Sequence, residues 1–389
     1  MKKLRFLILL FLATPLVFAQ EYQLLVDKHW SPYAGSSITI STYNFYKFID
    51  DKLLPNGEGH SDIPWLFART GKITLDYILS SFLTVSQHEI FGHGYRAREF
   101  GFSDISYEVH ISSGATYFLI SDYNSLNIYQ QNALNAAGME SNTILSQKLR
   151  QPWLMQKSID YRDGLFYFLN QFEQFNYVYI THHSDLDNGN DVNNYISGVN
   201  SYYGNNTLSN NKMRTAVLWD LFDPALYYSL YSIGDFLVNG TSKTTQLSML
   251  QIQDYQYLPA GRTIFAPWGL EFQLQNFVLT PENSLYQVNL RYGSNSNISS
   301  YGIDVNIKPI WRRDRWNIGN QVSIWVQPSM NFANAALTQQ RFGLAEFISF
   351  EYRAQKDVGF IGDIGYKTAG FMQGFLLDSS IIFRIGTKW

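Results

Sequence analysis

The chain contains no cysteine among its 389 residues. This absence excludes disulfide bonds, thiolate metal ligands, a cysteine nucleophile and a lipid-modified N-terminal cysteine. Charged residues are also few, at 16% of the chain, and the formal net charge is −3. Because nucleic-acid binding needs a basic surface, this balance gives no indication of a nucleic-acid partner.

Long apolar runs are absent after the first residues, since no later segment holds 18 apolar residues in succession. Such a sequence predicts no helical membrane span, which needs about 20. The chain begins with a basic stretch at 1–5, an apolar stretch at 6–18 and the small residue Ala19. This order predicts a secretory signal peptide over residues 1–19, and therefore an exported protein. A retained membrane anchor is the alternative.

Aromatic residues are plentiful, at 16% of the chain, and the second half shows a period of two. From residue 246 to 389, apolar residues such as Val288 and Leu290 alternate with polar ones such as Gln287 and Asn289. This alternation predicts antiparallel β-strands separated by turns. The pattern gives about eight strands, each of about 9–12 residues. They are expected near 246–256, 268–279, 284–293, 299–310, 316–327, 341–353, 357–367 and 374–386.

Alternation does not tell which face of these strands points inward. A soluble sandwich or barrel places its apolar side inside, whereas an outer-membrane barrel turns it toward lipid. The strand lengths suit a tilted membrane span, and aromatics such as Tyr286 and Trp325 fall near strand ends. The ending on Trp389 resembles the C-terminal aromatic signal of bacterial outer-membrane barrels. We therefore expect an outer-membrane β-barrel, with a periplasmic or secreted soluble β domain as the alternative.

The region from 20 to 245 has a different pattern. Helical spacing of apolar residues predicts helices over 73–98, 132–149, 153–175 and 224–237, and residues 39–49 form one possible strand. The expected fold class is therefore α+β, with a mainly helical N-terminal region (20–245) and a C-terminal antiparallel β-barrel (246–389).

Residues 88–93 read His-Glu-Ile-Phe-Gly-His. Two imidazoles and an intervening carboxylate are the residue types of a zinc hydrolase, in which the carboxylate acts as general base on a metal-bound water. In a regular α-helix, residues five apart lie about 140° apart around the axis. His88 and His93 can therefore bind one ion only if the helix is bulged or broken close to Gly92, and π-bulges concentrate at functional sites.

This motif resembles that of dipeptidyl peptidase III and its relatives, whose zinc motif is H-E-x-x-x-H with glycine before the second histidine. The resemblance implies that His88 and His93 bind Zn²⁺ and that Glu89 is the catalytic base. The family takes its third ligand from a glutamate on a second helix, and Glu140, 52 residues after His88, has that spacing. The match covers only this motif and Glu140, and the family's second motif with paired glutamates is absent.

Other polar residues are alternatives for the site. Glu99, Glu108 and His110 are further candidates for the third ligand. Residues 181–191 hold His182, His183, Asp185, Asp187 and Asp191 around a glycine. This segment resembles part of a calcium loop, but Ile196 occupies the position of the closing glutamate, so a polar turn is the better interpretation. His182 or His183 is also a candidate to stabilise an oxyanion.

These observations together predict an outer-membrane zinc-dependent hydrolase. The expected reaction is hydrolysis of an amide bond in a peptide or protein substrate, and the expected partner of the sheet is outer-membrane lipid. The rival hypothesis from the same sequence is a non-enzymatic outer-membrane barrel used in adhesion, assembly or envelope structure. A third is a soluble exported ligand-binding barrel in which the histidine pair is incidental.

Overall fold

The computed structural model describes residues 23–181, 190–204, 207–245, 247–295, 298–329, 340–355 and 358–389. The predicted signal peptide (1–19) lies outside this part of the chain. So do His182, His183, Asp185 and Asp187, and with them most of the polar segment considered as a calcium loop.

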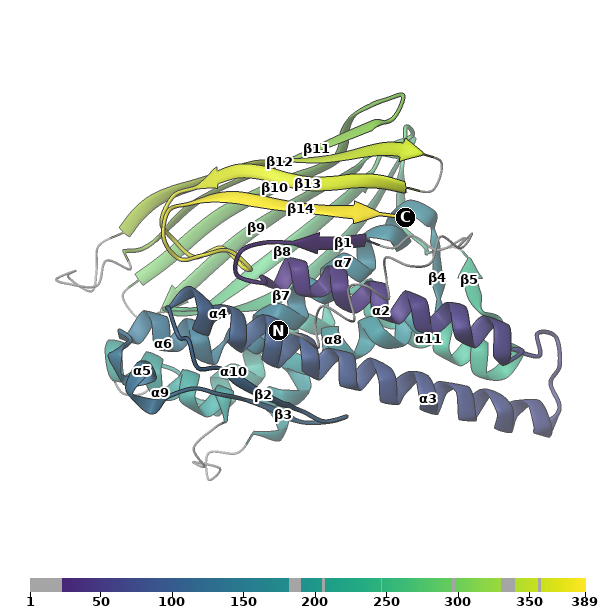
Figure 1. The fold of residues 1–389 in the computed structure, drawn as a ribbon, viewed down its shortest axis with the longest axis horizontal. Coiled ribbons are helices and arrows are strands. Elements are labelled where there is room, and N and C mark those ends of the chain that lie inside the picture. Colours follow the sequence, from purple (N-terminus) through teal and green to yellow (C-terminus); the bar gives the residue numbers. More distant parts are fainter. Residues whose placement is uncertain are drawn as a thin grey trace.

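The described N-terminal half is mainly helical, as the sequence predicts. Its helices pack beneath a curved sheet, and α2 and α3 run along the same long axis as the strands (Figure 1). The helices are α2 (Pro32–Leu53), α3 (Ile63–His88), the π-helix η1 (Glu89–His93), α4 (Gly94–Glu99), α5 (Ile120–Ser125), α6 (Ile128–Asn135), α7 (Ala137–Gln156), α8 (Tyr161–Ile180), α9 (Asp191–Tyr203), α10 (Asn210–Val217), the 3-10 helix η2 (Leu218–Leu221) and α11 (Pro224–Asn239). Short strands also occur there: β1 (Gln23–Val26), β2 (Ser106–Val109), β3 (Gly114–Tyr117), β4 (Ser158–Asp160) and β5 (Lys243–Thr245).

The strand considered for residues 39–49 is wrong, because this segment lies inside α2. Ser31 caps the helix by accepting a hydrogen bond from the Ala34 backbone N–H, and Pro32 occupies the first turn. This pairing of a serine cap with a proline is a strong start signal for a helix. Once started, the helix continues through residues of high strand propensity because its buried face packs against neighbouring elements.

The C-terminal half forms an antiparallel sheet of ten strands, in the order β1-β14-β13-β12-β11-β10-β9-β8-β7-β6. Its strands are β6 (Leu250–Ile252), β7 (Tyr255–Ala266), β8 (Gly269–Leu279), β9 (Leu285–Asn295), β10 (Ile298–Arg313), β11 (Trp316–Pro328), β12 (Gln340–Gln355), β13 (Val358–Lys367) and β14 (Ser380–Lys388). The predicted closed barrel is not found, because β1 and β6 form two separate edges and the sheet stays open.

Two strands of this sheet lie outside the eight predicted runs. β1 comes from the N-terminal region and pairs with β14, in a register that places Gln23 opposite Lys388. β7 has no alternation, since most of its second half is buried on both faces and it contains Pro259 and Gly261. A strand covered on both faces gives no period-two signal, which is why the sequence pattern passed over it.

The two faces of the sheet have opposite polarity, and the apolar face points outward. Leu290, Ile303, Ile324 and Leu344 lie opposite one another on successive strands and are exposed. The face toward the helices carries buried polar residues. Among them, Arg291 is paired with Asp304 at 3.2 Å and lies 3.5 Å from Glu271. Alternation alone did not tell which face of the strands points inward. In the structure the polar face points toward the helices and the apolar face points outward.

The helices fill the concave side of the sheet and share a core with it. Apolar residues of α7 and α8, including Trp153 and Phe166, pack with Leu258 of β7, Phe277 of β8 and Leu285 of β9. The helical region and the sheet are thus joined by common packing. In the part of the chain that the structure describes, no helix has the length and apolar character needed to cross a membrane.

Candidate metal centre

The two histidines of the motif are brought together by a change of helix type. The α-helix α3 ends at His88, and Glu89–His93 forms the π-helix η1 before α4 continues the chain. The wider turn rotates His93 back to the side of His88, so that the ring centroids lie 5.0 Å apart. The sequence-based condition that the helix be bulged near Gly92 is therefore confirmed.

Contacts from neighbouring elements hold the π-turn. A Cβ at Gly92 would lie 2.6 Å from the Ala137 carbonyl oxygen, so glycine allows the turn to pack directly on the backbone of α7. A π-turn also leaves carbonyl groups without their usual helical partner. Here Arg98 donates to the Ile90 carbonyl at 2.8 Å, and the Thr116 hydroxyl donates to the Glu89 carbonyl at 3.1 Å.

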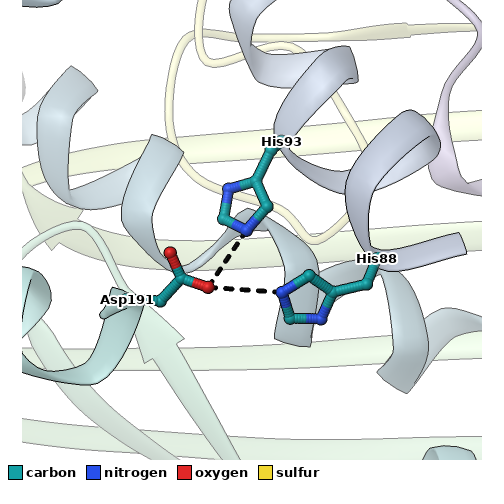
Figure 2. Close-up of side chains that lie close together, drawn as sticks. All are labelled: His88, His93 and Asp191. Carbon is teal, nitrogen blue, oxygen red and sulfur yellow. Dashed lines mark hydrogen bonds and ion pairs between the residues drawn. The ribbon is translucent and has the colours of Figure 1, made fainter. Parts of the chain in front are cut away.

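Both imidazoles point at one carboxylate oxygen. Asp191 Oδ2 lies 3.2 Å from His88 Nε2 and 3.1 Å from His93 Nε2, as Figure 2 shows. Asp191 is the first residue of α9, which is capped by the Asn190 side chain, and its backbone N–H donates to the Tyr177 hydroxyl at 3.2 Å. Two ligands held tetrahedrally at the usual zinc distances are about 3.3–3.4 Å apart. The observed separations are close to that value.

The other ring nitrogens are held by separate partners. His93 Nδ1 lies 2.8 Å from the Leu134 carbonyl oxygen. His88 Nδ1 lies 3.3 Å from Glu173 Oε1. The amide nitrogen of Asn142 lies 3.4 Å from the same His88 Nδ1. With Nδ1–H donated to these oxygens, a neutral ring keeps a lone pair on Nε2 that faces Asp191. A lone pair that faces a carboxylate needs a proton or a metal ion between the two atoms, and partners such as those of Nδ1 orient histidine ligands in metal sites.

The geometry therefore fits a cation. In the described residues, His88, His93 and Asp191 form one group whose ligand atoms all lie within 4.8 Å of one another. His88 and His93 are buried, and Asp191 is largely so. Two imidazole nitrogens and one carboxylate oxygen are donor atoms that could hold a metal ion.

The same arrangement perturbs the protonation of the site. Burial lowers the pKa of His93, but the charge of Asp191 and the hydrogen bond to it have the larger combined effect and raise the pKa above its ordinary value. Burial likewise raises the pKa of Asp191, yet the charge of His93 and hydrogen bonds from both rings hold it well below its usual range. Protons and metal ions thus compete for the same atoms.

Gly138 of α7 makes room for the first histidine. A Cβ at this position would lie 2.0 Å from His88 Nε2 and 2.2 Å from Cδ2. A side chain therefore cannot be added here while His88 keeps its place. The helix α7 also holds the backbone next to His88 in place, because the side chain of the preceding residue, Gln87, donates to Ser141 Oγ at 2.7 Å.

Glu89 lies beside the cluster and contacts the β2–β3 hairpin. The Thr116 hydroxyl donates to Glu89 Oε2 at 2.8 Å, and a Cβ at Gly114 would lie 2.7 Å from Glu89 Cγ. Its negative charge raises the pKa of His93, although less than Asp191 does. The carboxylate is thus buried, oriented by one hydroxyl and near enough to His93 to influence its pKa.

The structure does not bring Glu140 to the histidines. Its carboxylate forms an ion pair with Arg96 at 2.7 Å and accepts the Gly374 backbone N–H at 2.5 Å. Arg96 also pairs with Glu99 at 2.6 Å. These two acids link α4 and α7 to the loop before β14, since Glu99 accepts the Leu377 backbone N–H at 2.5 Å. Glu140 therefore has a structural partner, and Asp191 is the carboxylate that lies against both imidazoles.

The remaining candidates also lie elsewhere. Glu108 and His110 are paired with each other at 2.8 Å on the exposed hairpin. The sequence places Asp191 in a polar, calcium-like segment and does not predict its contact with His88. No signal in the sequence linked it to the motif, because 98 residues separate it from His93 and the contact depends on how α9 packs.

Comparisons with known proteins give no relative for this chain, since no family model, curated protein or solved structure matches it. The interpretation of the site therefore rests on its own geometry.

Proposed function

We propose that the protein is a metal-dependent hydrolase of the outer membrane that cleaves amide bonds in peptide or protein substrates. The observation that carries the proposal is the π-turn. It places His88 and His93 against one oxygen of Asp191, while the intervening Glu89 stays buried beside them. π-turns are costly and concentrate where a functional group must be aimed.

The chemistry of the donor set favours zinc. His88, His93 and Asp191 would hold the ion, and Zn²⁺ in such a site supplies a Lewis acid that activates water and polarises a carbonyl group. Glu173 and the Leu134 carbonyl keep the two rings in the tautomer that presents Nε2.

Glu89 is the proposed general base. It would accept the proton of the attacking water as the oxygen adds to the scissile carbonyl carbon, and pass that proton to the amine nitrogen as the C–N bond breaks. The hydrogen bond from Thr116 holds one carboxylate oxygen and leaves the other for this transfer. Peptide is the proposed substrate class because the motif resembles that of a peptidase.

The outward face of the sheet supports the membrane location. Exposed apolar residues run across successive strands. Charged residues on this face include Glu346 and, at the end of β10, Arg313. Strands of an outer-membrane protein have this polarity, with apolar side chains toward lipid and polar ones inside. A soluble sheet in this orientation would leave its apolar side in water at a large cost in free energy.

Metal content and turnover test the proposal together. Purified protein should hold about one zinc per chain and hydrolyse a quenched fluorescent peptide library. Glu89→Gln should keep the zinc and lose hydrolysis, because the amide cannot accept a proton. A matched control is Glu108→Gln. This glutamate lies in β2, is exposed and is paired with His110. Unchanged hydrolysis in Glu89→Gln, or full zinc content in a His88→Ala, His93→Ala double variant, would refute the proposal.

A further inference from the structure

Helix α3, which leads into the metal site, has its polarity reversed relative to a helix of a water-soluble protein. Its charged residues Arg69, Lys72 and Asp76 are 1%, 4% and 0% exposed. Its outward face carries no charge and is largely apolar. The exposed large side chains on that face are Ile63, Leu66, Phe67, Leu75, Tyr77, Ile78 and Phe82.

The inward charges of α3 are paired inside the protein. Lys72 lies 2.8 Å from Asp50 of α2, and Asp76 accepts hydrogen bonds from the Tyr46 and Tyr161 hydroxyls, both at 2.8 Å. The Arg69 guanidinium donates to backbone carbonyls, among them that of Val238 at 2.8 Å. Burying charge is costly unless it is paired in this way. These buried partners therefore stabilise α3 with its charged face toward the protein interior and its apolar face outward.

The neighbouring helices extend this uncharged surface. Ile49 of α2 is exposed, and so are Tyr227, Leu230 and Tyr231 of α11. In α3 the exposed apolar stretch runs over residues 63–82, which at 1.5 Å per residue is about 30 Å. That length equals the hydrocarbon thickness of a bilayer, about 30 Å. The helix also runs along the same axis as the strands (Figure 1).

We infer that α3, with α2 and α11, faces the acyl chains of the same bilayer as the outer face of the sheet, so that helices complete a wall that the open sheet leaves unfinished. The sheet and α3 lie on opposite sides of the molecule (Figure 1). A protein partner or a second copy of the chain would cover only one of these two apolar surfaces, whereas the lipid of a bilayer surrounds the molecule and covers both. This inference rests on the proposed membrane location.

The composition of α3 agrees with this arrangement. A helix surrounded by lipid must be apolar all round, whereas a helix in a wall presents only one face to lipid and packs the other against protein. Polar residues are then tolerated on the inner face. The low average hydropathy of α3 follows from its buried charges and not from its exposed surface.

Because the chain has no cysteine, single cysteines can be placed without altering the background. Phe67→Cys and Leu75→Cys probe α3, and Phe383→Cys probes the outer face of the sheet. His110→Cys, on the exposed β2–β3 hairpin, is the reference for water. Each variant is labelled with bimane, reconstituted into vesicles of phosphatidylcholine with brominated acyl chains, and also titrated with iodide.

The labels on α3 should be quenched by brominated chains as strongly as the label at Phe383, and protected from iodide. The label at His110 should show the reverse. Quenching by iodide at Phe67 and Leu75, with lipid quenching kept at Phe383, would overturn the inference and leave the membrane location standing. Protection from both quenchers at α3 would also overturn it, since protein would then cover the helix. Iodide quenching at Phe383 as well would remove the membrane location itself.

Discussion

Replacing Gly138 with alanine is the sharpest test of the site because it changes no ligand. The added Cβ would lie 2.0 Å from His88 Nε2, whereas ordinary contact begins at 3.4 Å. The ring must therefore retreat by about 1.4 Å, while a metal–ligand distance tolerates a change of about 0.2 Å. The displaced atom is the proposed ligand, so the variant should bind zinc poorly.

The helix α7 cannot move aside to relieve this contact. Ser141 Oγ donates to the Gln87 carbonyl at 2.9 Å and accepts from the Gln87 side chain at 2.7 Å, which fixes α7 against α3 one residue before His88. Backbone contact at Gly92 fixes it again on the other side. Loss of an outer partner of a ligand weakens metal binding about 10–100-fold. Displacement of the ligand itself should weaken zinc binding by at least about 100-fold, or about 2.7 kcal/mol.

Isothermal titration with zinc measures this effect on the purified, metal-free protein. Gly234→Ala in α11 is the matched control, since its Cβ would meet nothing within 4 Å. Alanine favours a helix over glycine by up to about 1 kcal/mol, so neither variant should unfold for lack of helix propensity. Zinc affinity equal to wild type in Gly138→Ala would show that His88 does not bind metal from the position described, and the proposed centre would be withdrawn.

Asp191→Asn should lower zinc affinity strongly in the same titration, whereas Glu140→Gln should leave it unchanged; the opposite ranking would restore Glu140 as the ligand. Glu140→Gln should instead lower thermal stability by about 1.5–3 kcal/mol, because Arg96 loses one of its two buried carboxylate partners and keeps Glu99, and an unchanged melting temperature would contradict this role. Zinc affinity should rise with pH through the raised pKa of His93, up to about tenfold per unit, since zinc binds only the neutral ring. A flat pH profile would show that this proton is not displaced.

The local features of the site could be predicted from sequence. The spacing of His88 and His93 is incompatible with a regular helix that aims both rings at one point, so a bulge near Gly92 followed from helix geometry alone. Glycine in the motif indicated where the backbone would distort. These are properties of six consecutive residues, and they need no knowledge of the rest of the fold.

The third partner could not be found in that way. Glu140 had a suitable spacing on a helix, but spacing does not tell what else competes for a carboxylate. Arg96, one turn beyond His93, takes both oxygens of Glu140. Asp191 reaches the site only because α9 begins beside Tyr177, which is a tertiary contact between segments far apart in the chain.

In the sheet, too, the local pattern could be predicted from sequence, whereas the features that depend on tertiary contacts could not. Alternation located most of its strands, yet it could not tell inside from outside, because the two possibilities have one pattern. The buried pair of Arg291 and Asp304 settles the polarity. Alternation also could not show that the sheet stays open, since closure depends on pairing between the first and last strands of the sheet and not on any strand alone.

The pairing of β1 with β14 has a consequence for the order in which the sheet can form. Gln23 and Lys388 are separated by more than 360 residues, yet they are direct neighbours in the sheet. A chain that stops anywhere before β14 leaves β1 without its partner strand. Contacts between such distant segments form late, because their loop-closure cost is met only when both are available. Deletion of β14 should therefore expose the backbone of β1, although the two strands lie far apart in the sequence.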